Sequence, residues 1–200
     1  RGKLNKTVNE NAREKFYRPT GGDSVTVMVY MCGTDLESKY GMATNDLIEM
    51  TKAKLSDNVN LIVYTGGAKA WKNSIVSEST NQIYQIKDGK LRKLADDNGQ
   101  PSMTDPNTLV RFIEYCKQNF PANRNQLIFW DHGGGSVTGY GYDENNPNAG
   151  SMNLSKIKSA IAATNIKYDF IGFDACLMAT TENALALSDY ADYLIASEET

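Results

Sequence analysis

The sequence predicts an α/β protein with a mainly parallel sheet, and two observations lead to this prediction. Short apolar runs rich in β-branched residues alternate along the chain with longer segments whose apolar residues have helical spacing. Within the apolar runs, apolar residues follow one another nearly without interruption. That pattern indicates strands buried on both faces, as in the parallel sheets of βαβ proteins.

The composition is that of a folded domain with a sizeable core. The chain has 200 residues, of which 40% are hydrophobic and 22% charged, and its net charge is −3. Because Lys and Arg form no basic stripe, we do not expect a nucleic-acid partner. No apolar stretch is long enough to span a membrane. Residues 1–22 are polar and aperiodic, so we expect an N-terminal arm or pro-segment, followed by one domain at 23–200.

The first elements form a predicted strand–helix–strand unit. SVTVMVYMCG at 24–33 is a near-continuous apolar run and therefore a buried strand. Helical spacing follows at 44–55, and VNLIVYTGG at 59–67 is the next strand, which ends at two glycines. Two apolar runs within 81–94 flank Asp88–Gly89, which predicts a hairpin as an antiparallel appendage.

The second half continues the alternation. The segment 103–121 predicts a helix with Pro106 in its first turn and Pro121 beyond its end. We then expect a strand at 125–135, a polar loop at 136–153, a helix at 154–164, a strand at 168–176, a helix at 177–188 and a strand at 191–200.

Two of the predicted parallel strands end in the same way. LIFWD is followed by His132, the only histidine of the chain, and FIGFD is followed by Ala175 and Cys176. Ligands of parallel sheets collect beyond the carboxyl ends of the strands. If these two strands are neighbours, an imidazole and a thiol therefore emerge at one rim of the sheet.

This pair of residues suits nucleophilic catalysis. A thiolate at Cys176 is a competent nucleophile, and we expect a helix to start directly after it, so that the helix N-terminus favours the thiolate. His132 can protonate a leaving amine if the fold brings it within reach. Gly133 lacks a Cβ, so the N–H groups of Gly133 and Cys176 can approach a substrate carbonyl and hold its oxyanion.

Simpler structural roles stay open for the same residue types. A lone His at a strand end can be a hydrogen-bonded structural residue. A lone buried Cys can be a small hydrophobic residue, which is the role we expect for Cys32 and Cys116. The three cysteines are too few and too widely spaced for a disulfide framework, and with one histidine they nearly exclude zinc.

The motifs at these strand ends resemble those of a known clan of peptidases. An apolar block ending in His-Gly, a spacer and an apolar block ending in Ala-Cys look like the signature shared by caspases, legumain, gingipains and clostripain. DACLM at 174–178, VYMCGTDLES at 29–38 and ASEET at 196–200 look most like the clostripain family, peptidase family C11. The resemblance covers about residues 24–200.

The resemblance implies a caspase-like α/β/α sandwich and a cysteine endopeptidase that cleaves after Arg or Lys through an acyl-enzyme. Cys176 matches the nucleophile of the Cys-His dyad, His132 its general acid/base and Gly133 the oxyanion-hole glycine. Asp174 matches the position thought to read the basic side chain, for which a carboxylate is suited; a strand-end cap is its alternative role. Asp131 ranks lower, as a group that orients His132 or binds substrate.

The resemblance also implies features of maturation and location. Family members are often activated by self-cleavage after Lys or Arg between the His and the Cys, yet residues 133–155 contain neither. The basic residues of the arm are alternative cut sites. We expect the protein to continue beyond Thr200, a second chain from the same precursor as a partner, and a secreted, periplasmic or cell-surface bacterial location. We expect no required cofactor, and the oxygen-rich segments 33–38 and 142–150 leave calcium open.

Other functions are weighed against this interpretation. The main alternative is a caspase-like scaffold or binding module without catalysis. A nucleotide-binding α/β domain is disfavoured because neither G-x-G-x-x-G nor a P-loop occurs. A serine hydrolase is disfavoured because the chain lacks a G-x-S-x-G elbow.

Overall fold

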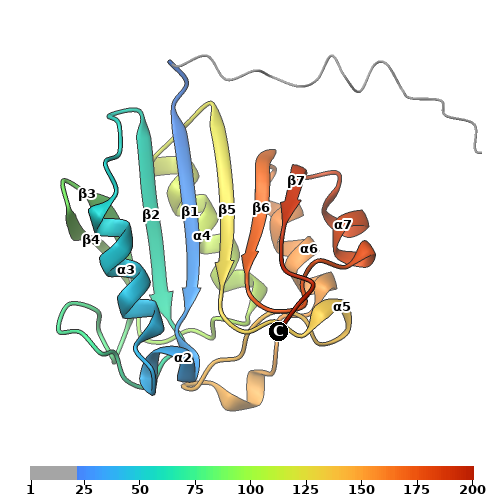
Figure 1. Cartoon of the computed structure of the whole chain (residues 1–200), viewed down its shortest axis with the longest axis horizontal. Coiled ribbons are helices and arrows are strands. Elements are labelled where there is room, and N and C mark those ends of the chain that lie inside the picture. Colours follow the sequence, from blue (N-terminus) through green and yellow to red (C-terminus); the bar gives the residue numbers. More distant parts are fainter. Residues whose placement is uncertain (1–21) are drawn as a thin grey trace, which may run out of the picture.

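The protein is described by a computed structural model of residues 22–200, in which a seven-stranded sheet carries helices on both faces (Figure 1). All but the last residue of the predicted N-terminal arm, 1–22, lies outside the described residues. The strands follow the order β4-β3-β2-β1-β5-β6-β7 across the sheet. Their bounds are β1 Val25–Cys32, β2 Val59–Gly66, β3 Asn81–Lys87, β4 Lys90–Asp97, β5 Arg124–Trp130, β6 Tyr168–Asp174 and β7 Ala191–Ile195.

The sheet is mainly parallel, as the sequence predicts. The strands β1, β2, β5, β6 and β7 run parallel, while β3 pairs antiparallel with both β2 and β4. Asp88 and Gly89 join β3 to β4 with φ angles of 52° and 70°, the left-handed pair that a tight hairpin turn requires. The hairpin does not stand apart from the sheet, because β3 pairs with β2 and the hairpin forms one edge.

The helices cover both faces and complete an α/β/α sandwich. Figure 1 shows α3 on one face and α4 and α6 on the other. A hydrophobic core lies on each face of the sheet, and β1, β2 and β5 contribute residues to both cores. Met28 and Tyr30 lie in the core beneath α4 and α6, whereas Val29 packs with Leu47 of α3. The helices are α2 Thr34–Ser38, α3 Met42–Lys52, α4 Pro106–Asn119, α5 Gly135–Thr138, α6 Leu154–Thr164 and α7 Thr181–Leu187, with a 3₁₀ turn η1 at Pro147–Ala149.

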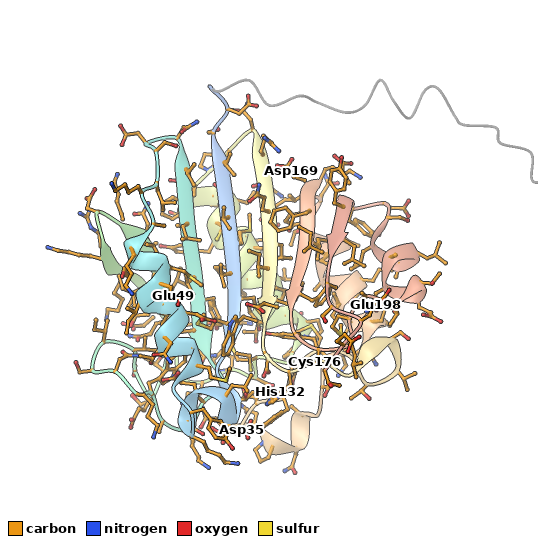
Figure 2. The ribbon with its side chains drawn as sticks, in the orientation of Figure 1. Asp35, Glu49, His132, Asp169, Cys176 and Glu198 are labelled. Atoms are coloured by element: carbon orange, nitrogen blue, oxygen red, sulfur yellow. The ribbon has the colours of Figure 1, made fainter. Side chains whose placement is uncertain are left out.

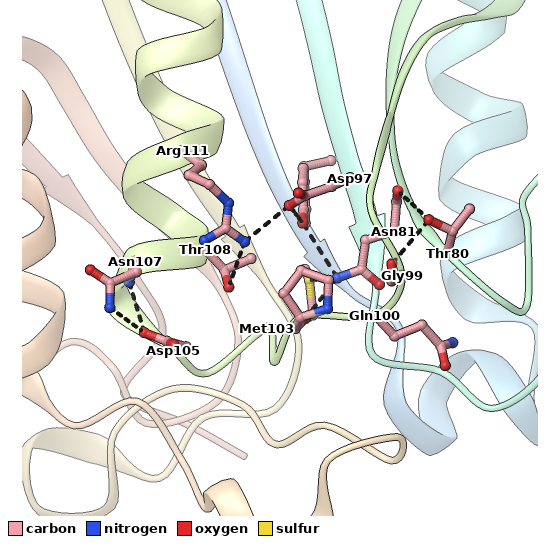
Figure 3. A network of polar contacts seen from close by, with 12 residues as sticks. Thr80, Asn81, Asp97, Gly99, Gln100, Met103, Asp105, Asn107, Thr108 and Arg111 are labelled. Atoms are coloured by element: carbon pink, nitrogen blue, oxygen red, sulfur yellow. Dashed lines mark hydrogen bonds and ion pairs between the residues drawn. The ribbon is translucent and has the colours of Figure 1, made fainter.

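The start of α4 is fixed by a cap and by the segment that leads into it (Figure 3). The Asp105 carboxylate accepts from the Asn107 main-chain N–H at 2.9 Å, and Pro106 occupies the first turn. Arg111 then reaches back from α4 to Asp97 at the end of β4, at 3.1 Å. These contacts anchor the long connection between the hairpin and the helix.

Cys32 and Cys116 are fully buried, as expected of small hydrophobic residues. Burial raises the pKa of both thiols, so neither is suited to act as a thiolate. Cys176 is the one cysteine of the chain that has some exposure to solvent. None of the helices in residues 22–200 is long and apolar enough to cross a membrane.

One predicted element was wrong in a way that affects the site. No helix starts directly after Cys176; residues 175–180 form a turn and an extended segment, and α7 begins only at Thr181. Leu177 has a φ of 61°, a left-handed conformation that a continuing helix cannot include. Thr180 caps α7 instead by accepting from the Asn183 N–H at 3.2 Å. Cys176 therefore does not lie at the N-terminus of a helix, whose positive potential was expected to favour its thiolate.

Candidate active site

The carboxyl ends of β5 and β6 lie side by side. Trp130 pairs with Asp174 across the two strands, and the Asp131 N–H donates to the Asp174 carbonyl at 3.3 Å. His132 and Cys176 follow immediately on these two strands and emerge at the same rim of the sheet (Figure 2). Both line one pocket of about 460 Å³. The structure therefore brings together the imidazole and the thiol that the sequence placed at two strand ends.

The main chains of the two strand ends approach each other closely at Gly133. A Cβ at Gly133 would lie 2.1 Å from the Cys176 carbonyl oxygen and 2.9 Å from Met178 Cγ, so a glycine is required. The turn after Cys176 is held from the other side by the segment that follows β7. Leu177 and Ala179 donate to the carbonyls of Glu199 and Ser197 at 3.1 and 3.0 Å. The nucleophile candidate thus lies in a turn tied to its neighbours on both sides.

His132 is held by three groups. Its Nε2 lies 2.8 Å from Asp35 Oδ1, and its main-chain N–H donates to Asp131 Oδ1 at 2.6 Å. The Tyr142 ring stacks on the imidazole with a centroid separation of 5.7 Å and an interplanar angle of 14°. The imidazole side chain is still 42% exposed, so it is open to the pocket while being held in position.

Asp35 was not recognised as a site residue in the sequence, although the segment that contains it was noted for its oxygens. It lies in the first turn of α2, just after β1, the strand next to β5. Besides His132, it accepts from the Tyr142 hydroxyl at 2.7 Å and from Lys39 Nζ at 3.2 Å. The hydrogen bond from His132, followed by that from Tyr142, holds the pKa of the Asp35 carboxyl well below its usual range, so Asp35 is ionised at neutral pH.

Asp131 lies beneath the site and is 3% exposed. Its oxygens accept from the Thr34 hydroxyl at 3.0 Å, the Tyr142 N–H at 3.1 Å and the His132 N–H. Burial raises the pKa of Asp131 to about 7, against the lowering effect of these hydrogen bonds. Gly141 is required beside it, because a Cβ there would lie 2.5 Å from Asp131 Oδ2. Asp131 lines the same pocket, but its burial and hydrogen bonds suit orientation of His132 better than contact with substrate.

Asp174 has the opposite environment, because it is exposed at the pocket. Partial burial, and next the negative charge of Asp46, raise the pKa of its carboxyl. Asp46 also lines the pocket and accepts from Trp130 Nε1 at 2.6 Å. Leu36 and Met42 supply apolar surface beside these acids. A pocket with carboxylates and apolar walls suits a cationic side chain on an aliphatic stem.

The sequence profile of the Clostripain family, Peptidase C11, matches residues 29–200. The chain belongs to the clostripain family. It is 30% identical to clostripain of Hathewaya histolytica, over 80% of this chain and 35% of clostripain. The family assignment agrees with the resemblance seen in the sequence motifs.

Solved structures extend the comparison for this clostripain-family chain. A secreted C11 cysteine protease from Bacteroides thetaiotaomicron, in complex with an irreversible peptide inhibitor, has a TM-score of 0.70 and 26% identity, over 86% of this chain and 48% of its own. An inactive zymogen C11 protease from Parabacteroides distasonis has a TM-score of 0.66 and 25% identity, over 91% of this chain and 50% of its own. The chain thus spans about a third of clostripain and about half of each of these two solved relatives.

The acidic loop that suggested calcium in this clostripain-family chain uses its oxygens internally. Asp143 is buried and accepts from the main-chain N–H groups of Met103 and Asn145, both at 2.8 Å. Within residues 22–200, no group of three or more His, Cys, Asp or Glu side chains is placed to hold a metal ion. Calcium binding stays a prediction from the resemblance.

Proposed function

We propose that this chain carries the catalytic centre of a cysteine endopeptidase that cleaves peptide bonds after Arg or Lys. The observation that supports the proposal most is the convergence of His132 and Cys176 on one pocket that also contains the Asp174 carboxylate. Clostripain-family membership adds support, since the solved relatives are named as C11 cysteine proteases. Residues 23–200 are, in this proposal, the part of the catalytic domain that this chain contains.

In the proposed reaction, the Cys176 thiolate attacks the carbonyl carbon of the scissile bond. The N–H groups of Gly133 and Cys176 hold the resulting oxyanion. The imidazolium of His132 gives its proton to the leaving nitrogen as the C–N bond breaks, which releases the amine product and leaves a thioester. Water then attacks the thioester while His132 takes a proton from it, and the C–S bond breaks. The product acid is released as a carboxylate, its proton passes to solvent, and the Cys176 thiolate and the His132 imidazolium are restored.

Substrate selection in this proposal depends on the acidic pocket. Asp174 binds the guanidinium or ammonium group of the P1 residue, for which its exposure at the pocket suits it better than the buried Asp131. Asp131 orients His132 through the main-chain N–H. The chemistry needs no cofactor, because thiol, imidazole and main-chain donors supply every group in the reaction.

We extend the proposal to location and assembly. The Bacteroides relative is named as secreted, and we propose that this protein is likewise a bacterial protein outside the cytoplasm. Its partner is a peptide or protein substrate with a basic P1 residue. We also propose a second chain from the same precursor as a partner, since one solved relative is named as an inactive zymogen.

The decisive experiment compares two cysteines of the full-length protein. Cys176→Ala should abolish cleavage of an Arg- or Lys-terminated reporter peptide, whereas Cys116→Ala, on the buried face of α4, should remain active. A thiol-directed peptide probe with a basic P1 residue should label Cys176 only. Cleavage that persists in Cys176→Ala would refute the proposal, and absence of labelling would favour a non-catalytic caspase-like scaffold.

A further inference from the structure

We infer that Asp35 and Tyr142 are positioning residues that fix the tautomer and the ring plane of His132, an inference that rests on the proposed peptidase function. Asp35 approaches only one of the two ring nitrogens, Nε2, at 2.8 Å. An ionised carboxylate has no proton to give, so the hydrogen of this bond lies on Nε2. In the neutral imidazole, the lone pair is then on Nδ1, which becomes the nitrogen for proton transfer.

The same contact favours the charged form of the ring during the reaction. When His132 takes up a second proton, the negative charge on Asp35 stabilises the imidazolium through the existing hydrogen bond. Asp35 is only 22% exposed in its side chain, so solvent screens this interaction less than it screens a surface ion pair. Lys39 also contacts Asp35 but is 57% exposed and binds the other carboxylate oxygen.

Tyr142 restrains both partners of this pair. Its hydroxyl donates to Asp35 Oδ1, the oxygen that also faces His132, and its ring stacks on the imidazole. The main chain of Tyr142 is itself fixed, since its N–H donates to Asp131 and its carbonyl accepts from the Cys32 thiol at 3.0 Å. The ring of Tyr142 is therefore a rigid support against which the imidazole lies.

This arrangement gives the polar loop between His132 and Cys176 a part in the site. Tyr142 lies within residues 133–155, a stretch without Lys or Arg. A peptidase that cleaves after basic residues would leave this stretch intact, and with it the support for the imidazole. The support of the His132 imidazole thus uses three chain segments: the start of α2, the end of β5 and the loop that follows α5.

The test measures Asp35→Asn and Tyr142→Phe in the full-length protein, with Asp169→Asn as the matched control. Asp169 also forms an ion pair, at 2.6 Å with Arg124, and its side chain is 25% exposed, close to the 22% of Asp35. Figure 2 shows that Asp169 lies at the opposite end of the sheet from Asp35 and His132. A merely structural role of a partly buried carboxylate would thus affect both Asp variants alike.

We expect Asp35→Asn to lower kcat by at least about tenfold with KM changed less than about twofold; the matching Asp-to-Asn change in a Ser-His-Asp triad lowers kcat by about 10⁴-fold, which sets the upper end. Tyr142→Phe, which keeps the ring and loses the hydroxyl, should lower kcat by a smaller factor. At a pH where the imidazole is neutral, its ¹⁵N spectrum, assigned by comparison with a His132→Gln variant, should show Nε2 protonated and Nδ1 unprotonated. Asp35→Asn should reduce that preference, and Asp169→Asn should leave both kcat and the spectrum unchanged.

Each outcome separates this inference from the proposed function. If Cys176→Ala is inactive but Asp35→Asn retains the kcat and the ¹⁵N spectrum of Asp169→Asn, the positioning role is overturned while the peptidase function stands. If Cys176→Ala is active, the peptidase proposal itself has failed. Should Asp35→Asn not fold, Tyr142→Phe carries the test, because an unchanged kcat in that variant overturns the role of the Asp35–Tyr142 pair.

Discussion

Gly133→Ala is the perturbation whose effect can be worked out most directly from the structure. The added Cβ would lie 2.1 Å from the Cys176 carbonyl oxygen. A relaxed carbon–oxygen contact is about 3.3 Å, so the two strand ends must separate by about 1 Å. A misplacement of about 1 Å between reacting groups can lower the rate by about 100-fold. We therefore expect kcat for a basic reporter peptide to fall by about two orders of magnitude.

The control for this prediction is another glycine of the same sheet. At Gly172, in β6, an added Cβ would meet its nearest neighbour, Phe170, at an ordinary 3.4 Å, so Gly172→Ala should keep most of its activity. Overpacking at Gly133 should also cost stability, by about 1–3 kcal/mol, which thermal unfolding can measure. If Gly133→Ala folds and cleaves at a rate within twofold of the unmodified protein, the close approach of the strand ends is not what the active site requires.

Two further predictions concern the acidic residues. Asp174→Ala should lower kcat/KM for Arg- and Lys-terminated peptides by about 10- to 100-fold, the value of a charge-assisted contact, with little change for neutral P1 residues. Glu49→Gln, on the exposed side of α3, is the control. Equal losses for all P1 residues would exclude Asp174 as the specificity residue. Asp131 has its pKa raised from 3.8 to about 7, so the folded state binds a proton more tightly than the unfolded state. Its contribution favours folding at low pH and is lost as pH rises from about 4 to about 7. Asp131→Asn should remove that part of the pH dependence of the free energy of unfolding. If the slope of this free energy against pH is unaltered in the variant, the pKa of Asp131 is not raised in the folded state.

The sequence predicted the fold well because its signals are local and repeated. Near-continuous apolar runs identified each parallel strand, and the Asp88–Gly89 turn identified the hairpin. The rule that ligands collect at the carboxyl ends of parallel strands predicted that His132 and Cys176 emerge at one rim if their strands are neighbours, and both residues line one pocket. These predictions needed only residue type and period, which a single sequence contains.

The parts that the sequence did not predict depend on tertiary contacts or on single backbone angles. Asp35 and His132 are 97 positions apart, and no local pattern joins them. Asp35 could have been found by applying the strand-end rule to the first strand as well as to the other two. The late start of α7 depends on the left-handed φ of Leu177, and helical spacing of apolar residues does not reveal such an angle.

The strand order brings the residues of the site together. β1, β5 and β6 are consecutive in the sheet, and each is followed by one of the groups that meet at the rim: Asp35, His132 and Cys176. Strands in a sheet lie about 4.8 Å apart, so three groups that follow adjacent strands start within side-chain reach of one another. A strand inserted between β5 and β1, or between β5 and β6, would move His132 about 4.8 Å further from Asp35 or from Cys176. The parallel pairing of β5 with both β1 and β6 is therefore the structural condition on which the proposed chemistry depends.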